Sequence, residues 1–176
     1  LSKIVQDMPD SGIKDFFDVA NTMEGALSLG VGEPDFPTPE HVREAAIASI
    51  KKGDTKYTDN RGTVELRAAA ADYLTKFDLH YDKQDEILIT MGASEGIDLA
   101  LRTLVNPGEE VLVAEPSYVS YIPCIELCGG VPVSLKLRAE NKFRLTREQL
   151  EEKITEKSKV LLISYPNNPT GAIMEK

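Results

Sequence analysis

The stretch Glu110-Val-Leu-Val-Ala-Glu-Pro-Ser-Tyr-Val-Ser-Tyr-Ile-Pro-Cys-Ile-Glu-Leu-Cys-Gly-Gly-Val-Pro-Val-Ser-Leu-Lys-Leu137 indicates how this chain folds. It begins with Glu110–Ala114 and ends with Val131–Leu137, two mostly apolar runs with the length of buried strands. Between them, Pro116-Ser-Tyr118 opens a helical segment and Gly129-Gly130 closes it. A strand, a helix and a second strand in this order predict two parallel strands joined by a crossover helix.

The same alternation continues on both sides of this unit. Upstream, Glu86–Thr90 is a short apolar strand, and Met91-Gly-Ala-Ser94 turns into a helix that ends at Asn106-Pro-Gly108. Downstream, Thr146-Arg-Glu-Gln149 is a capping box that opens a helix. The run Lys159–Tyr165 is nearly all apolar, which is typical of a strand covered on both faces. We predict an α/β fold with three layers, a mostly parallel sheet with helices on both faces.

The N-terminal part of the chain is less regular. Residues 1–30 are weakly patterned, and we expect a short helix or an arm there. The segment Gly30–Pro39 is too dense in proline and glycine for a regular element. Thr38 is the expected N-cap of a helix that has Pro39 at its first position and ends at Gly53. Thr63 is expected to cap a second helix.

Composition excludes several classes of partner. The 176 residues include 20 Lys and Arg against 29 Asp and Glu, a net charge of −9. This acidic balance argues against binding a nucleic-acid backbone, which needs clustered basic residues. No apolar stretch approaches the roughly 20 residues of a membrane helix. The first twenty residues carry too many charges for a secretory signal peptide.

The two cysteines, Cys124 and Cys128, are too few for a disulfide scaffold or a thiolate metal site. The histidines His41 and His80 lie far from them in the sequence. We therefore expect buried free thiols that act as small apolar groups, and no metal centre. Reduced thiols without an export signal indicate a cytoplasmic protein.

The residues that follow the strands are the candidate site, because ligands of parallel sheets bind beyond the carboxyl ends of the strands. Gly92, Ala93 and Ser94 open a helix whose free N–H groups suit a phosphate, although Ser94 is equally a good N-cap. Tyr118 is either an aromatic packed at a helix start or a flat ring that stacks on a planar ligand. Asn167-Asn-Pro-Thr-Gly171 is either a tight turn or the support of an amide donor. Neither a P-loop nor a dinucleotide-binding glycine pattern is present.

Several motifs stand in the order of a known family. They are Gly30-Val-Gly-Glu-Pro-Asp-Phe-Pro-Thr-Pro39, Lys56-Tyr57 with Gly62, strand-Gly92-Ala-Ser94, Asn106-Pro-Gly-Glu-Glu110, Glu115-Pro-Ser-Tyr-Val-Ser-Tyr121 and Tyr165-Pro-Asn-Asn-Pro-Thr-Gly171. With them the chain resembles, from about Ser11 onward, the pyridoxal-phosphate-dependent aminotransferases of fold type I, class I/II. The opening Ser11-Gly-Ile-Lys-Asp-Phe-Phe is most similar to the bacterial aminotransferase A group.

The resemblance implies pyridoxal phosphate as the cofactor and gives it four binding residues in its own subunit, with Tyr57 of a neighbouring subunit as a fifth. The backbone N–H groups of Ala93 and Ser94, with the Ser94 hydroxyl, would hold the phosphate. Tyr118 would stack on the pyridine ring, where many relatives have Trp or Phe. Asn168 would donate to the phenolic oxygen, which helps the ring act as an electron sink.

The resemblance also implies the substrates and a shared site. The substrates would be an amino acid and a 2-oxo acid, with Gly32 against the substrate carboxylate and Asn168 beside the substrate. Tyr57 would reach the phosphate of a neighbouring subunit, so that a homodimer would share its active sites. The peptide bond before Pro169 would be cis, as it often is in the family.

The chain departs from the family pattern at its end, because Lys176 is only five residues beyond Gly171. In the family, the Schiff-base lysine, the Asp that pairs with the pyridine nitrogen and the substrate-binding arginine all lie further on. We therefore expect an inactive N-terminal half with unpaired strand edges, which a complementary fragment or partner chain would complete. Residues 1–35 would be the arm and part of a small domain, and residues 36–176 the first half of the large cofactor-binding domain. The rest of the large domain and the C-terminal small domain would be absent.

Two alternatives to an aminotransferase follow from the same residues. A pyridoxal-phosphate-dependent β-eliminating lyase has a similar first half, and the residues that separate the two reactions lie mostly outside this chain. A regulator that senses its ligand with an aminotransferase-like domain carries a winged helix upstream, and residues 1–30 show no such pattern.

Overall fold

The computed structural model describes residues 1–8, 18–19, 22–25, 32 and 34–174. The chain divides into two compact units, one of residues 9–88 and one of residues 1–8 together with 89–176. The predicted boundary between residues 35 and 36 stays a prediction. Of the predicted N-terminal arm, residues 1–30, the structure describes the short helix α1 (Lys3–Asp7) and residues 1–2, 8, 18–19 and 22–25, and the others lie outside the described residues.

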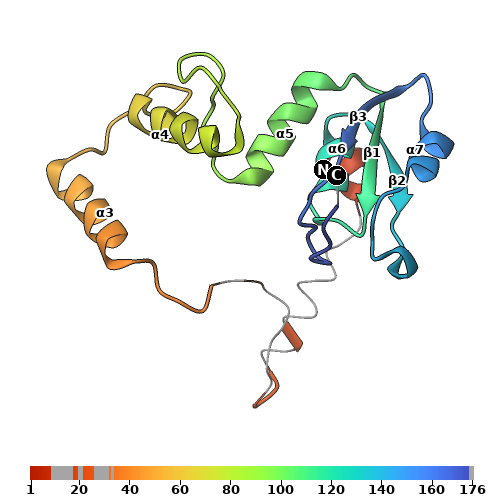
Figure 1. Ribbon diagram of the computed structural model, residues 1–176, viewed down its shortest axis with the longest axis horizontal. Coiled ribbons are helices and arrows are strands. Elements are labelled where there is room, and N and C mark those ends of the chain that lie inside the picture. Colours follow the sequence, from red (N-terminus) through yellow and green to blue (C-terminus); the bar gives the residue numbers. More distant parts are fainter. Residues whose placement is uncertain (9–17, 20–21, 26–31, 33, 175–176) are drawn as a thin grey trace. The chain divides into compact units, whose positions relative to one another are not determined.

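The larger unit is built on a parallel sheet (Figure 1). Its strands are β1 (Glu110–Glu115), β2 (Val131–Lys136) and β3 (Ser158–Leu162), in the order β2-β1-β3. Both neighbours run parallel to β1, and the register pairs Leu112 with Val133 on one side and with Leu161 on the other. The predicted strand–helix–strand unit is thus confirmed.

Helices cover both faces of this sheet. On one face, α5 (Ala93–Leu104) and α6 (Tyr121–Leu127) pack on Val111 and Val113 of β1, in a core that includes the fully buried Ile125. Leu112 points to the opposite face because side chains alternate along a strand. There it lines a hollow with Leu150 of α7 (Arg147–Lys153). The predicted layered α/β fold, with an incomplete domain, is confirmed.

Local capping signals form as predicted in this unit. Thr146 and Gln149 make both bonds of the capping box at the start of α7. The helix after Tyr118 begins later than predicted, at Tyr121, because the carbonyl of Tyr118 accepts from the Tyr121 N–H in a turn that precedes it. The short 3-10 helix η2 (Ala139–Asn141) lies between β2 and α7.

The prediction of a strand over residues 86–90 is wrong. Residues 87–90 carry no strand pairing, since no strand in the described part of the chain lies beside them to complete a ladder. The fourth predicted strand, β3, was expected to be covered on both faces, and this too is wrong. Leu161 and Ile163 are 40% and 45% exposed, as at the edge of a sheet.

The smaller unit is helical. It contains α3 (Glu40–Lys52), α4 (Val64–Leu74) and the 3-10 helix η1 (Thr75–Phe77). Gly53 ends α3 in the left-handed conformation and the Thr63 hydroxyl caps α4, both as predicted. At the start of α3, Pro39 occupies the N-cap position that was predicted for Thr38, and no side chain caps this end.

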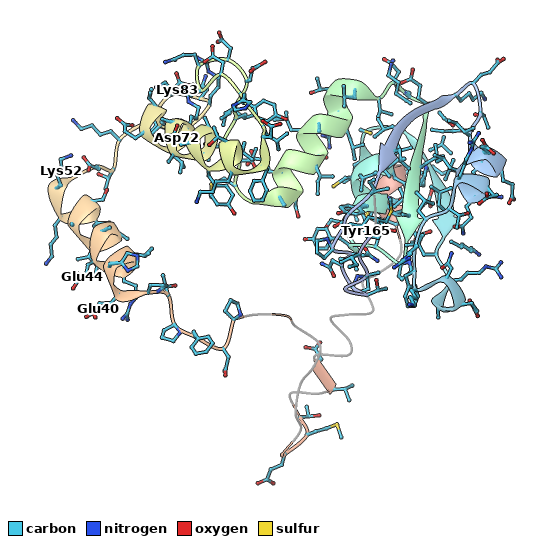
Figure 2. All side chains as sticks on the ribbon, viewed as in Figure 1. Glu40, Glu44, Lys52, Asp72, Lys83 and Tyr165 are labelled. Carbon is cyan, nitrogen blue, oxygen red and sulfur yellow. The ribbon has the colours of Figure 1, made fainter. Side chains whose placement is uncertain are left out.

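Charged side chains, and not a side-chain cap, stabilise the ends of α3. Glu40 and Glu44 lie toward the beginning of the helix and Lys52 at its end (Figure 2). This order opposes the partial charges of the helix termini and stabilises it.

A buried arginine holds the smaller unit together. Arg67 of α4 is 1% exposed, and its guanidinium donates to the carbonyls of Lys83 (2.6 Å), Gln84 (3.0 Å) and Gly62 (3.3 Å). Arg67→Ala should lower the free energy of unfolding by about 2 kcal/mol, because three carbonyls lose a charged donor and water replaces it only in part. Chemical denaturation followed by far-UV circular dichroism measures this loss.

Arg61→Ala is the matched control for Arg67→Ala. The Arg61 side chain is 42% exposed and pairs with Asp59 at 3.5 Å and with Asp85 at 3.0 Å. It also donates to the carbonyl of Gln84, which it shares with Arg67. Exposed ion pairs contribute little, so we expect a change below about 1 kcal/mol. Equal losses in the two variants would contradict a special role for the buried guanidinium.

Candidate functional site

The candidate site begins at the N-terminus of α5. Gly92 is its N-cap with φ 88° and ψ 168°, and the first bond of the helix runs from the N–H of Gly96 to the carbonyl of Gly92 at 3.4 Å. The N–H groups of Ala93 and Ser94 precede this bond and have no acceptor within the helix. Both residues are exposed, so their N–H groups are available to an anion.

A small network fixes the turn that leads into α5. The Thr90 hydroxyl donates to the carbonyl of Gly92 at 2.9 Å, and the carboxylate of Glu95 accepts from the N–H of Met91. The Glu95 charge is thereby directed back to the preceding turn and stabilises the helix N-terminus. The predicted phosphate residues Ala93 and Ser94 thus follow a defined turn.

The structure brings Tyr118 to this helix terminus. The Tyr118 hydroxyl lies 3.1 Å from the Ser94 hydroxyl, although the two residues belong to different segments. The Tyr118 ring packs edge-on against Tyr121 of α6, with ring centroids 5.7 Å apart. Hydrogen bonding with Ser120, and then with Ser94, lowers the pKa of Tyr118 below that of an unperturbed phenol. Ser94 and Tyr118, predicted separately, therefore lie at one place.

The loop after β3 is anchored beside the loop that carries Tyr118. Asn167 is 6% exposed, and its side-chain amide donates to the carbonyl of Pro116 at 3.1 Å and to the hydroxyl of Thr170 at 2.9 Å. Its backbone closes the loop with bonds to Gly171 and Ala172. The sequence analysis missed this role of Asn167. The signal was the doubled asparagine, of which one turns inward.

Asn168, the predicted cofactor residue, is the exposed member of this pair. The Asn168–Pro169 peptide bond is cis, as expected from the family. Before it, Tyr165, labelled in Figure 2, donates to the carbonyl of Phe143 at 3.2 Å and accepts from the N–H of Leu145 at 3.3 Å. Bonds on both sides thus hold the backbone that presents Asn168.

Two other predicted residues, Gly32 and Tyr57, belong to the unit of residues 9–88. Tyr57 is fully exposed, and no atom of the described residues lies within 4 Å of where a Cβ on Gly32 would be. Their roles stay predictions.

In the described residues, no group of His, Cys, Asp and Glu side chains could hold a metal ion. Both cysteines are free: Cys124 is buried, where burial raises the pKa of its thiol, and the Cys128 thiol donates to the carbonyl of Ile125. Among the same residues, no helix has the length and apolar character needed to cross a membrane.

The donor set fits a planar, phosphorylated ligand. Free N–H groups and the Ser94 hydroxyl meet at a helix N-terminus and suit a phosphate, which only accepts hydrogen bonds at its oxygens. Tyr118 contributes an aromatic ring, and the loop that Asn167 anchors carries the exposed Asn168. Pyridoxal phosphate has these three features: a phosphate, a flat ring and a polar ring substituent.

Several known proteins that are similar to this chain are named as aminotransferases. The chain is 48% identical to the putative aminotransferase YugH of Bacillus subtilis and 43% identical to aromatic-amino-acid aminotransferase 2 of Thermococcus litoralis. Both alignments cover all of this chain and 46% of the relative, so the chain spans about half the length of these proteins. The structure of aspartate aminotransferase from Thermus thermophilus with maleate matches with a TM-score of 0.92 and 35% identity, over 100% of this chain and 47% of that one.

A family model covers most of the sequence as well. The model described as aminotransferase class I and II matches residues 24–176. This range includes the helix terminus, Tyr118 and the asparagine loop. The chain therefore belongs to the aminotransferase class I and II family.

Proposed function

We propose that the protein containing this chain is a pyridoxal-phosphate-dependent aminotransferase that moves an amino group between an amino acid and a 2-oxo acid. The observation that carries the proposal is the meeting of Ser94 and Tyr118 at the free N–H groups of α5. When bound, pyridoxal phosphate supplies the electron sink for this reaction. Family membership supports this chemistry.

Each of the site residues predicted above has its own part in the proposed site. The N–H groups of Ala93 and Ser94 and the Ser94 hydroxyl hold the phosphate. The ring of Tyr118 orients the pyridine ring, and the amide of Asn168 donates to its phenolic oxygen and lies beside the substrate. Gly32 leaves room for the substrate carboxylate.

We further propose a cytoplasmic homodimer in which Tyr57 reaches the phosphate of the neighbouring subunit. The full exposure of its side chain leaves it free to do so. The 176 residues alone are proposed to be inactive, since they hold one side of the cofactor and correspond to 46% of the length of the relatives. The remaining site residues would come from outside this chain.

The test uses the protein expressed from the full reading frame that encodes this chain. It is incubated with pyridoxal phosphate, 2-oxoglutarate and a panel of acidic, aromatic and aliphatic amino acids. An aminotransferase forms glutamate and a new 2-oxo acid in equal amounts. Release of ammonia without glutamate would instead identify a lyase, and binding without turnover would identify a sensor.

The shared site can be tested by mixing two impaired variants. Tyr57→Ala and Asn168→Ala each damage one residue of the proposed site. In a random mixture, half of the dimers are hybrids with one intact site, so about a quarter of all sites should become fully active. Activity is measured before and after the subunits exchange. No recovery would show that Tyr57 acts within its own subunit or not at all.

A further inference from the structure

The hydroxyl groups of Ser94 and Tyr118 form a pair that stacking of a ring does not require. Their oxygens are 3.1 Å apart, and either could be the donor. A phenylalanine at position 118 would stack equally well on a cofactor ring. Stacking therefore does not explain the contact between the two hydroxyls.

The position of the Tyr118 hydroxyl is fixed by the core. Its ring lies edge-on to Tyr121 at an interplanar angle of 82°, and Tyr121 is 8% exposed. The carbonyl of Tyr118 also accepts from the N–H of Tyr121 at 3.1 Å. Ser94, by contrast, is exposed on the first turn of α5, where a free hydroxyl rotates among several directions. The Tyr118 hydroxyl, whose position is fixed, can thus orient the Ser94 hydroxyl.

A bound phosphate would decide the direction of this hydrogen bond. A serine hydroxyl has one proton and two lone pairs, and phosphate oxygens accept hydrogen bonds. With an anion at the N–H groups of α5, the Ser94 proton points to the anion, so Tyr118 must donate to Ser94. The hydrogen bond with Ser120, the largest cause of the lowered pKa of Tyr118, also makes the Tyr118 hydroxyl a better donor in this bond.

We propose that Tyr118 is a positioning residue of the phosphate site: its hydroxyl donates to Ser94 Oγ and directs the Ser94 proton at the cofactor phosphate. This inference rests on the proposed function, because it takes the ligand of α5 to be pyridoxal phosphate. It adds to Tyr118 a second role that is separate from stacking. The two roles are separable, because only one of them requires the phosphate.

The experiment compares pyridoxal phosphate with pyridoxal, which lacks the phosphate. Both affinities are measured by equilibrium titration with the protein from the full reading frame, its Tyr118→Phe and Ser94→Ala variants and the double variant. Tyr118→Phe should lower the affinity for pyridoxal phosphate about fivefold, which is the effect of losing one hydrogen bond. It should leave the affinity for pyridoxal unchanged. The double variant should bind no more weakly than Ser94→Ala alone, because both changes break one chain of hydrogen bonds.

Tyr121→Phe is the matched control, since it removes a tyrosine hydroxyl from the adjacent ring and leaves the Ser94 contact in place. It should not change the ratio of the two affinities. If Tyr118→Phe weakens both ligands equally, or if the two losses add, the positioning role is refuted. If the unaltered protein binds neither ligand, the proposed function fails and this inference with it. If it prefers pyridoxal phosphate and Tyr118→Phe keeps that preference, only this inference fails.

Discussion

Replacing Gly92 with alanine is expected to weaken the binding of pyridoxal phosphate by about thirtyfold to a hundredfold. At φ 88° and ψ 168°, Gly92 has a backbone conformation that is almost exclusive to glycine. No atom lies within 4 Å of an added Cβ, so the cost arises in the backbone itself and not from a collision. Such strain amounts to about 2 to 3 kcal/mol, which corresponds to this range of affinity.

The alanine variant escapes the strain by rotating the peptide that precedes Ala93. That rotation turns an N–H group away from the phosphate. Gly96→Ala is the control in the same helix, because its added Cβ makes an ordinary contact of 3.4 Å with Thr90. It should stabilise α5 by about 0.5 to 1 kcal/mol without changing affinity. Unchanged binding by Gly92→Ala would show that α5 does not hold the phosphate.

Sequence reasoning succeeded where a structure depends on near neighbours. The hydroxyls of Thr63 and Thr146 cap helices as predicted, and Gly53 ends α3 in the left-handed conformation. Each of these features involves residues within one turn of each other, so a short motif contains all the necessary information. The order of strands and helices around β1 follows from the same local signals.

Sequence reasoning failed where an element depends on a partner that is distant in the sequence. Residues 86–90 have the composition of a strand, but a strand forms only when another strand completes its hydrogen bonds. The coverage of β3 failed for the same reason, since Leu161 and Ile163 are apolar yet exposed. The composition of a segment shows whether its side chains can be buried. Whether they are buried depends on which other elements the fold places against them.

In the candidate site, too, some features could be predicted from the sequence and others could not. Ser94 and Tyr118 were expected to meet because each would follow a parallel strand, and their hydroxyls do meet, although residues 86–90 form no strand. The hydroxyl contact between them depends on side-chain packing against Tyr121 and was not foreseen. Tyr57 and Gly32 were assigned through family resemblance alone, and no pattern in their own neighbourhood indicates a ligand.

Substituting the two adjacent asparagines should have different effects: one change should lower stability and the other should lower catalytic activity. Asn167→Ala removes the amide that holds Pro116 and Thr170, and leaves the carbonyl of Pro116 without this donor. We expect the free energy of unfolding to fall by about 2 to 3 kcal/mol. Asn168 is exposed, so Asn168→Ala should leave stability unchanged. It should nevertheless lower kcat/KM about a hundredfold, because a donor to developing charge on the cofactor is lost.

Thermal unfolding and steady-state kinetics on both variants test this separation, and each variant is the control for the other. Asn167→Ala should also lose activity, but cooling or a stabilising osmolyte should restore part of it, since its defect lies in the folded population and the loop that it anchors. Neither treatment restores an absent donor, so Asn168→Ala should stay impaired under all conditions. Loss of stability in Asn168→Ala with full activity in Asn167→Ala would reverse the assignment. It would mean that the buried amide, and not the exposed one, turns toward the cofactor when the ligand binds.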